Sequence, residues 1–160
     1  FRSEGSDRAP TVAPGAGVRH PPRPDTRCRV YPPSGAARVQ DDPRVTSYVL
    51  LVDDDDTFRR LAARLLAALD LGEVVEAATV GSALEAAERL RPVAALVDVS
   101  LPDGDGVELA RRLAAMAWTP RVLLTSSDLE PPARAGAIPF VAKDHLADGA
   151  LRSRLAGGSG

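Results

Sequence analysis

The sequence lacks several features, and each absence excludes a class of protein. A single cysteine, Cys28, in 160 residues cannot form an internal disulfide and fits a reducing cytosol. No apolar run approaches the ~20 residues that cross a bilayer, so we expect a cytoplasmic protein without membrane contact. The amino terminus, FRSEGSDRAP, has no apolar core and therefore does not resemble a signal peptide.

The chain also has little net charge and almost no lysine. The formal net charge is −2, and residues 1–45 are weakly basic whereas the remainder is acidic. Neither part is basic enough to predict direct binding to nucleic acid. Lys143 is the only lysine, against 19 arginines. Because the planar guanidinium of arginine cannot imitate a compact ammonium group, this lone lysine is a candidate for a specific role.

Residues 1–46 show no helical or strand periodicity and hold eight of the 14 prolines. Such a segment cannot bury enough surface to offset the loss of backbone entropy on folding. We therefore expect disorder at 1–46, one domain at 47–156 and a flexible tail at 157–160. This composition leads us to expect that 1–45 is a linker or sequence upstream of the true start. A proline-rich ligand built on PPRP is the functional alternative.

From residue 48 onward, short apolar runs alternate with amphipathic stretches. Strands are expected at 48–52, 73–77, 93–99, 121–125 and 139–143, and helices at 57–69, 81–90, 107–116 and 146–155. In the first helix, an apolar stripe is expected to face the core, and it consists of Phe58, Leu61, Leu65 and Leu69, widened by Ala62 and Leu66. Apolar strands that alternate with helices indicate a parallel sheet covered on both faces. The predicted fold class is α/β, with a doubly wound sheet.

Polar side chains stand at the ends of four of these strands, where ligands bind in doubly wound folds. They are three carboxylates, a run of hydroxyls and one ammonium, from Asp53, Asp54, Asp98, Thr125–Ser127 and Lys143. Clustered carboxylates without an arginine among them favour a hard divalent cation such as Mg²⁺. The metal and Lys143 together would hold a phosphoryl group, and one carboxylate can become an aspartyl phosphate.

Four segments carry a resemblance to a known family. VLLVDDD, ALVDVSLPDGDG, VLLTSS and FVAKD, in this order, resemble the receiver domain of bacterial two-component response regulators, over residues 47–155. The resemblance implies a five-stranded parallel sheet of CheY-like order 2-1-3-4-5, counting the expected strands along the chain. It also implies phosphorelay signalling by a phosphoacceptor domain that assists only its own phosphorylation and dephosphorylation, rather than by an enzyme that turns over substrate.

The resemblance assigns roles to the acids at the strand ends. Asp98 would be the phosphoacceptor. Asp53 and Asp54 would bind Mg²⁺ together with Asp98, and the backbone carbonyl of Ser100 would be a further ligand. The phosphoryl donor would be a histidine kinase or a phosphotransfer protein.

The resemblance also implies a switch. Thr125 would contact the phosphoryl group and move toward it, Lys143 would pair with a phosphoryl oxygen, and Phe140 would repack in the space that Thr125 vacates. The resulting population shift would act on an output partner that the sequence does not identify, or on a DNA-binding output domain missing from this chain.

The chain departs from the family between the fourth and fifth strands. Pro131–Pro132 lies where a fourth helix would run, and proline inside a helix removes a hydrogen bond and clashes with the preceding turn. We expect a short or irregular helix of about one turn that Pro131 opens and that ends at Gly136. No output domain is visible in the sequence. We therefore expect either a stand-alone receiver or the receiver part of a longer regulator.

Two other functions remain open. The spacing Asp53-x-Asp55-x-Thr57 matches the opening of haloacid-dehalogenase-type phosphatases, with Asp53 as nucleophile and Asp55 as general acid. The simpler interpretation of Asp55 and Asp56 is that they cap the following helix. The remaining alternative is a pseudo-receiver that binds a partner independently of phosphorylation.

Overall fold

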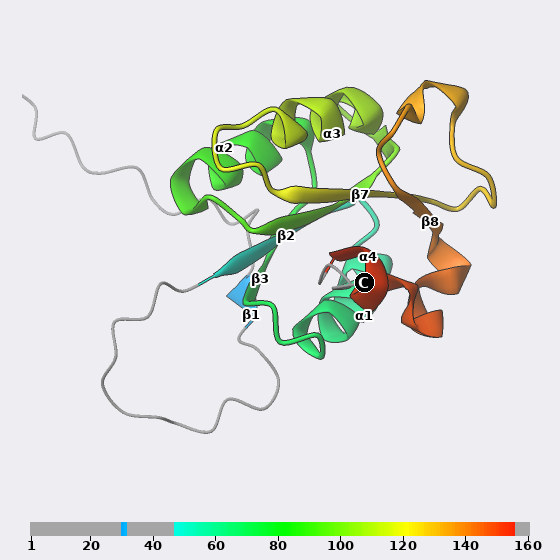
Figure 1. The fold of residues 1–160 in the computed structure, drawn as a ribbon, viewed down its shortest axis with the longest axis horizontal. Helices are drawn as coiled ribbons and strands as arrows, with labels where there is room; N and C mark the ends of the chain where they lie inside the picture. The colour runs from blue at the N-terminus through cyan, green and yellow to red at the C-terminus, as the bar shows by residue number, and fades with distance from the viewer. Residues whose placement is uncertain (1–29, 32–46, 156–160) are drawn as a thin grey trace, which may run out of the picture.

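The computed structural model describes residues 30–31 and 47–155, in which a six-stranded sheet lies between two layers of helices (Figure 1). The strands stand in the order β1-β3-β2-β4-β7-β8. Their bounds are Val30–Tyr31 for β1, Tyr48–Val52 for β2, Glu73–Ala77 for β3, Ala94–Asp98 for β4, Arg121–Ser126 for β7 and Phe140–Ala142 for β8. Strands β5 (Ser100–Leu101) and β6 (Gly104–Asp105) form a separate two-stranded hairpin.

The five strands β2, β3, β4, β7 and β8 are parallel and stand in the predicted order. The prediction of a doubly wound sheet of order 2-1-3-4-5 is therefore confirmed. Strand β1 is an addition, because it pairs antiparallel with β3 in a segment where the sequence predicted no strand. The other residues of 1–46, and the tail at 157–160, lie outside the described residues, so their disorder stays a prediction.

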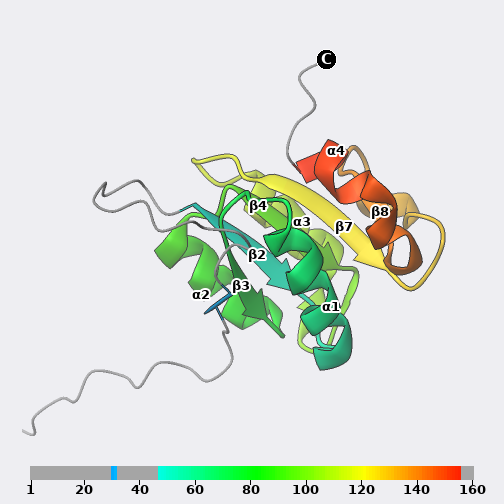
Figure 2. The same ribbon diagram turned by 90° about the horizontal axis from the view of Figure 1, so that it is seen from below.

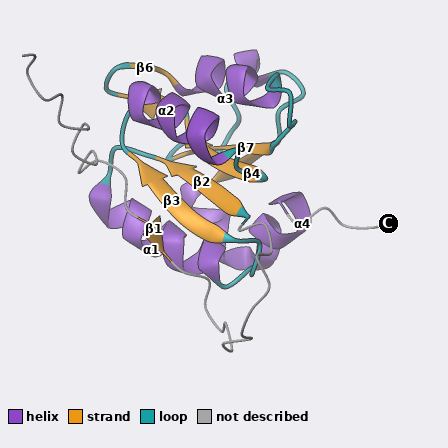
Figure 3. Cartoon of the chain, turned by 90° about the vertical axis from the view of Figure 1, so that its left-hand side faces the viewer, coloured by secondary structure: helices purple, strands orange, loops and turns teal. Residues whose placement is uncertain are grey.

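Within the described residues, four α-helices cover the sheet, namely α1 (Asp56–Ala67), α2 (Val80–Leu90), α3 (Gly106–Ala114) and α4 (Leu151–Leu155). Helices α2 and α3 pack on one face, and α1 and α4 pack on the other (Figure 3). Figure 2 shows the strands side by side from the face that carries α1 and α4. Side chains of β2 alternate between the layers: Leu50 packs toward α2 and α3, whereas Leu51 packs toward α1 and α4. Burial on both faces explains why the strands are apolar throughout.

Helix α1 begins at a cap provided by Asp55, whose carboxylate accepts hydrogen bonds from the backbone N–H groups of Thr57 and Phe58. Its buried face is formed by Phe58, Ala62, Ala63, Leu66 and Ala67. The prediction that Leu61 faces the core is wrong, since its side chain is 55% exposed. Small alanines allow the helix to lie close to the sheet, and the contact therefore centres on the alanine positions rather than on Leu61.

A single 3₁₀ turn, η1 (Ala133–Ala135), replaces a fourth helix of ordinary length. Pro132 precedes this turn in an extended conformation, with φ −62° and ψ 137°, and Gly136 ends it at φ 63°. Proline disfavours helical backbone at the residue before it, which keeps Pro131 out of the turn. The prediction of a shortened helix that ends at Gly136 is confirmed, although Pro131 does not open it.

The last helical segment of the domain is interrupted, so the prediction of a continuous helix at 146–155 is wrong. A 3₁₀ turn, η2 (Lys143–His145), leads into a π-helical stretch, η3 (Leu146–Ala150), and only then into α4. Gly149 adopts φ 79°, a left-handed value that an α-helix does not accommodate. Within the described residues, no helix combines the length and the apolar character needed to cross a membrane.

Candidate functional site

The strand register brings the predicted site residues to one rim of the sheet. Asp98 ends β4 and lies opposite Thr125 of β7, which in turn lies opposite Val141 of β8. Asp53 directly follows β2, and Lys143 directly follows β8. Because neighbouring parallel strands end at the same edge, residues far apart in the sequence become neighbours there.

Lys143 joins two of the acids. Its Nζ lies 2.7 Å from Asp53 Oδ2 and 3.2 Å from Asp98 Oδ1. The lysine side chain is 14% exposed, so these ion pairs are largely sheltered from water. The only lysine of the chain is thus the shared counter-ion of two carboxylates from different strands.

Asp53 is fully buried and is held on both its side chain and its main chain. Its Oδ1 accepts a hydrogen bond of 2.9 Å from the backbone N–H of Asp55, and its carbonyl oxygen accepts one of 2.6 Å from the Arg59 guanidinium. Arg59 also lies 3.4 Å from the buried Glu76. Sequence reasoning missed both Arg59 and Glu76. The signal was an acid inside the apolar strand EVVEA, since a buried carboxylate needs a partner.

Asp98 is 4% exposed, and its Oδ2 accepts a hydrogen bond of 3.1 Å from the backbone N–H of Ser100. Gly106 packs directly against it: a Cβ at this position would lie 1.8 Å from the carbonyl oxygen of Asp98. The backbone N–H of Gly106 donates to the Val99 carbonyl at 3.0 Å. The last glycine of LPDGDG is therefore required by close approach of two backbone segments.

Two acids of the same loop fix it to helices. Asp103 accepts hydrogen bonds from the backbone N–H groups of Val80 (2.7 Å) and Gly81 (3.1 Å) at the start of α2. These bonds from the backbone lower the pKa of Asp103. Asp105 caps α3 by accepting from the Val107 N–H at 2.9 Å. Sequence reasoning had given neither acid a role.

The rim contains a donor set that suits a hard cation. Carboxylate oxygens of Asp53, Asp54 and Asp98 all lie within 4.8 Å of one another, and Asp54 is exposed to solvent. The hydroxyl of Thr125 is buried and makes no hydrogen bond within the described part of the chain. Oxygen ligands in this number fit Mg²⁺, and an unpaired buried hydroxyl fits a site that receives a further polar group.

Burial shifts the acid–base properties of the rim. Burial raises the pKa of Asp53, and the hydrogen bond from Lys143 opposes this only in part. Burial likewise raises the pKa of Asp98 against the attraction of Lys143. Burial would lower the pKa of Lys143, but the two carboxylates outweigh it, so this pKa is raised. The ammonium therefore stays charged, and the acids bind protons more readily than ordinary aspartates.

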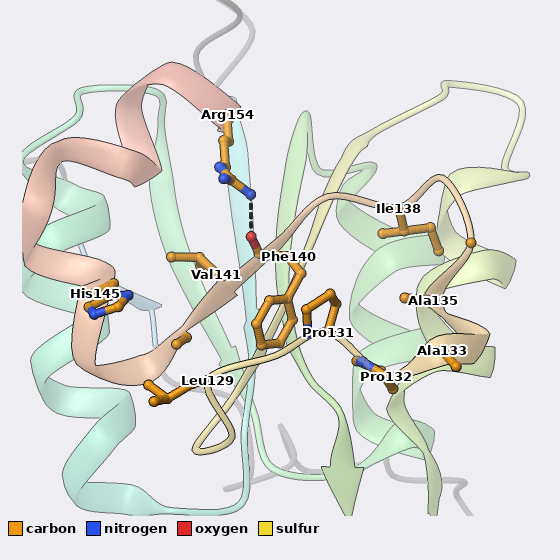
Figure 4. Close-up of a pocket in the computed structure, with 12 residues that line it drawn as sticks. Leu129, Pro131, Pro132, Ala133, Ala135, Ile138, Phe140, Val141, His145 and Arg154 are labelled. Carbon is orange, nitrogen blue, oxygen red and sulfur yellow. Dashed lines mark hydrogen bonds between the residues drawn. The ribbon is translucent and has the colours of Figure 1, made fainter.

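Phe140 lies apart from the acids, on the wall of a groove of about 730 Å³ beside η1 (Figure 4). Its ring stands next to Pro131, and its carbonyl accepts a hydrogen bond from the Arg154 guanidinium. Arg134 of η1 pairs with Asp105 at 2.7 Å, which ties one wall of the groove to the loop after Asp98.

Asp55 is poorly suited to the general-acid role of the phosphatase alternative. Its carboxylate accepts hydrogen bonds from the backbone N–H groups of Phe58 and Thr57, and these bonds lower its pKa. A general acid must hold a proton at the working pH, so its pKa has to be raised instead. Asp56 lies in the first turn of α1 and pairs with Arg59 and Arg60.

Comparisons with known proteins agree with this geometry. The profile of the family described as the response regulator receiver domain matches residues 49–155. The transcriptional activator DevR/DosR of Mycobacterium tuberculosis is 39% identical over 102 residues, which cover 60% of this chain and 47% of the relative. The transcriptional regulatory protein KdpE of Escherichia coli is 33% identical over 111 residues, which cover 67% of this chain and 48% of the relative. The chain thus spans about half the length of these two regulators.

Solved structures give the same result. A putative response regulator from Chloroflexus aurantiacus superimposes with a TM-score of 0.58 at 26% identity, covering 69% of this chain and 98% of that one. The BeF₃-activated receiver domain of Klebsiella pneumoniae RstA superimposes with a TM-score of 0.56 at 26% identity, covering 68% and 98%. The chain therefore belongs to the response regulator receiver domain family.

Proposed function

We propose that the chain accepts a phosphoryl group on Asp98, in a reaction that requires Mg²⁺, from a histidine kinase or a phosphotransfer protein. The observation that carries this proposal is the pair of contacts that Lys143 makes with Asp53 and Asp98, at 2.7 and 3.2 Å. The ammonium of Lys143 can pair with a negative phosphoryl oxygen, and the acids can hold a divalent cation that offsets their own charge.

In this reaction a carboxylate oxygen of Asp98 forms a bond to phosphorus. The bond between phosphorus and the donor atom breaks, and its electron pair stays on the donor. The product is an acyl phosphate, which is the mixed anhydride of the Asp98 carboxyl and phosphoric acid. Asp98 has to be ionised to attack, and the neighbouring ammonium of Lys143 favours that form.

Asp53, Asp54 and Asp98, with the backbone carbonyl of Ser100, would hold the cation. When bound, Mg²⁺ would supply positive charge that offsets the acids and the phosphoryl oxygens. The chain itself supplies Lys143, whose ammonium would pair with a phosphoryl oxygen, and Thr125, whose unpaired hydroxyl would donate to another.

The switch that we propose follows from these contacts. Thr125 would move toward the new phosphoryl group, and Phe140 would repack in the volume that Thr125 leaves. Phe140 lines the groove beside η1, so its rearrangement would alter a surface that an output partner can read. Arg134 of η1 pairs with Asp105, so the loop after Asp98 is linked to the turn that lines the groove.

One observation favours the alternative of a pseudo-receiver. The single turn η1 stands where the family has a whole helix. In the pseudo-receiver alternative, a partner binds this altered face independently of phosphorylation. In that case the groove would have the same affinity for its partner before and after treatment with a phosphoryl donor.

Mass measurement tests the proposal. The wild type, Asp98→Ala and Asp53→Ala are incubated with acetyl phosphate, with Mg²⁺ or with a chelator, and the intact masses are recorded. We expect one added phosphoryl group in the wild type, dependent on Mg²⁺ and absent from Asp98→Ala. A label that persists in Asp98→Ala would instead favour the phosphatase-like nucleophile, Asp53. No label in any sample would leave the phosphorylation-independent module.

A further inference from the structure

The Lys143 ammonium has a third neighbour besides the two acids. Its Nζ lies 4.4 Å from the centre of the Phe58 ring. The two carboxylates and the ring therefore approach one nitrogen atom, and they come from the residue after β2, from β4 and from α1. A cation at this distance from the face of an aromatic ring is attracted by the negative charge of the π-system.

Phe58 is itself held firmly. Its backbone N–H donates to the Asp55 carboxylate at 3.2 Å, and its side chain is 9% exposed in the core beneath α1. Among the described residues, the other members of this core cluster are all aliphatic, including Leu66, Val141 and Leu146. The contact with the ammonium is a specific reason for an aromatic residue at this position.

Unlike the acids, the Phe58 ring is not a candidate ligand for a divalent cation. The carboxylates of Asp53 and Asp98 are also the candidate ligands of a divalent cation, which would compete with Lys143 for their oxygens. The ring cannot ligate such a cation through oxygen, so its attraction for the ammonium persists when the acids are engaged elsewhere. A lysine side chain has several rotatable bonds and adopts many conformations in solvent if nothing holds its ammonium group.

We propose that Phe58 is a positioning residue that holds the Lys143 ammonium at the rim while the acids engage a divalent cation. The proposal rests on the function proposed above, and it adds a residue outside the acids, hydroxyl and lysine considered there. The same geometry accounts for lysine rather than arginine at this position. Three neighbours converge on one nitrogen atom, whereas a planar guanidinium spreads its charge over several atoms.

The single lysine allows a direct test by NMR. In protein made with ¹³C-labelled lysine, the methylene signals next to the ammonium come from Lys143 alone. We expect these protons to be shifted upfield by the ring in the wild type and in Phe58→Tyr, and to be unshifted in Phe58→Leu. Unshifted protons in the wild type would overturn the proposal.

The motion of Lys143 separates positioning from mere contact. We expect its side-chain order, measured by ¹³C relaxation, to be retained on addition of Mg²⁺ in the wild type and in Phe58→Tyr, and to fall in Phe58→Leu. Leu66→Val is the matched control, because Leu66 belongs to the same core cluster but is not one of the three groups that surround the Lys143 ammonium. Equal order in the wild type and Phe58→Leu with Mg²⁺ would contradict the proposal, as would a similar loss of order in Leu66→Val.

Phosphorylation gives the functional readout. With acetyl phosphate and saturating Mg²⁺, the initial rate should fall about two- to tenfold in Phe58→Leu and recover in Phe58→Tyr. An unchanged rate in Phe58→Leu would overturn the role of the ring. If even the wild type is not labelled, the proposed function fails, while the NMR result still decides whether Phe58 positions Lys143.

Discussion

At the scale of single residues, the rim contains more negative charge than the chain compensates. Asp53 and Asp98 are both buried, and a buried carboxylate remains charged only at a considerable cost unless it is paired. Lys143 is the common partner of both acids, and Asp54 adds a third carboxylate nearby. A divalent cation is the simplest addition that balances this set. Burial is the main cause of the raised pKa values of Asp53 and Asp98.

We predict that Mg²⁺ affinity falls as the pH becomes mildly acidic. Burial raises the folded-state pKa of Asp53 and of Asp98, so the folded protein without metal binds protons at a higher pH than the unfolded chain does. Mg²⁺ needs the ionised form and has to displace those protons. Calorimetric titration in two buffers of different ionisation enthalpy should detect proton release at mildly acidic pH and little at alkaline pH. Proton release that does not depend on pH would contradict this prediction.

Gly106 provides a second prediction at this scale. In Gly106→Ala, the new Cβ would lie 1.8 Å from the Asp98 carbonyl oxygen, so the backbone that carries the phosphoacceptor has to move. We expect a loss of about 1–3 kcal/mol in the free energy of unfolding, measured by urea denaturation, together with reduced labelling by acetyl phosphate.

Gly81→Ala is the matched control for that substitution. Gly81 stands at the start of α2, and a Cβ there would have only an ordinary contact, 3.8 Å from Asp103 Oδ2. This variant should be as stable as the wild type or more stable by up to ~1 kcal/mol. If both variants had the same stability, the close approach at Gly106 would not constrain the loop.

At the scale of elements, the loop after Asp98 is held by helix termini. The hairpin of β5 and β6 brings Asp103 to the first N–H groups of α2 and Asp105 to the first turn of α3. Both helices pack on the same face of the sheet, so the loop is held between two rigid neighbours. Such support keeps the Asp98 carboxylate and the Ser100 backbone in a fixed relation, as a site for phosphoryl transfer needs.

We predict that Asp103→Ala destabilises the protein and that Asp103→Asn does so to a smaller extent. Thr79 remains the N-cap of α2, but loss of the bonds from the Val80 and Gly81 N–H groups to Asp103 should cost about 1 kcal/mol in the free energy of unfolding, whereas asparagine still accepts from these groups. Glu88→Ala, an exposed change on the same helix, is the control and should have little effect. If Asp103→Ala were as stable as the wild type, the Asp103 contacts with α2 would not stabilise the protein.

The pH dependence of that stabilisation has a definite sign. Hydrogen bonds from the backbone lower the folded-state pKa of Asp103 relative to its ordinary value. The stabilisation is therefore fully present above the unfolded pKa, and it is lost as the pH falls through the lowered folded pKa. Urea denaturation of the wild type and Asp103→Ala over this acidic range should show their stabilities converging as the pH falls.

At the scale of the whole molecule, the order of the sheet and the location of the rim could be predicted, because both follow from the sequence pattern. Five apolar runs alternate with helices, and four of these runs end at polar residues, among them Asp53, Asp98 and Lys143. The one-turn η1 could be predicted as well, because Pro131 and Pro132 exclude a longer helix.

Other features depend on packing that one sequence does not encode locally. The contact between Arg59 and Glu76 joins α1 to β3, and the contact between Phe58 and Lys143 joins residues at opposite ends of the domain. The exposure of Leu61 depends on how closely α1 lies against the sheet. The interruption before α4 depends on the backbone that Gly149 adopts, which the residue type permits but does not require.

The assignment of Asp98 as phosphoacceptor is tested most directly by locating the phosphorylated residue. The protein is treated with acetyl phosphate and Mg²⁺ and then with borohydride, which reduces an acyl phosphate and converts that aspartate to homoserine. Peptide fragmentation then locates the homoserine. We predict homoserine at position 98 alone, and no homoserine when Mg²⁺ is withheld. Homoserine at position 53, or unmodified aspartate at both positions, would contradict the assignment of Asp98 as phosphoacceptor.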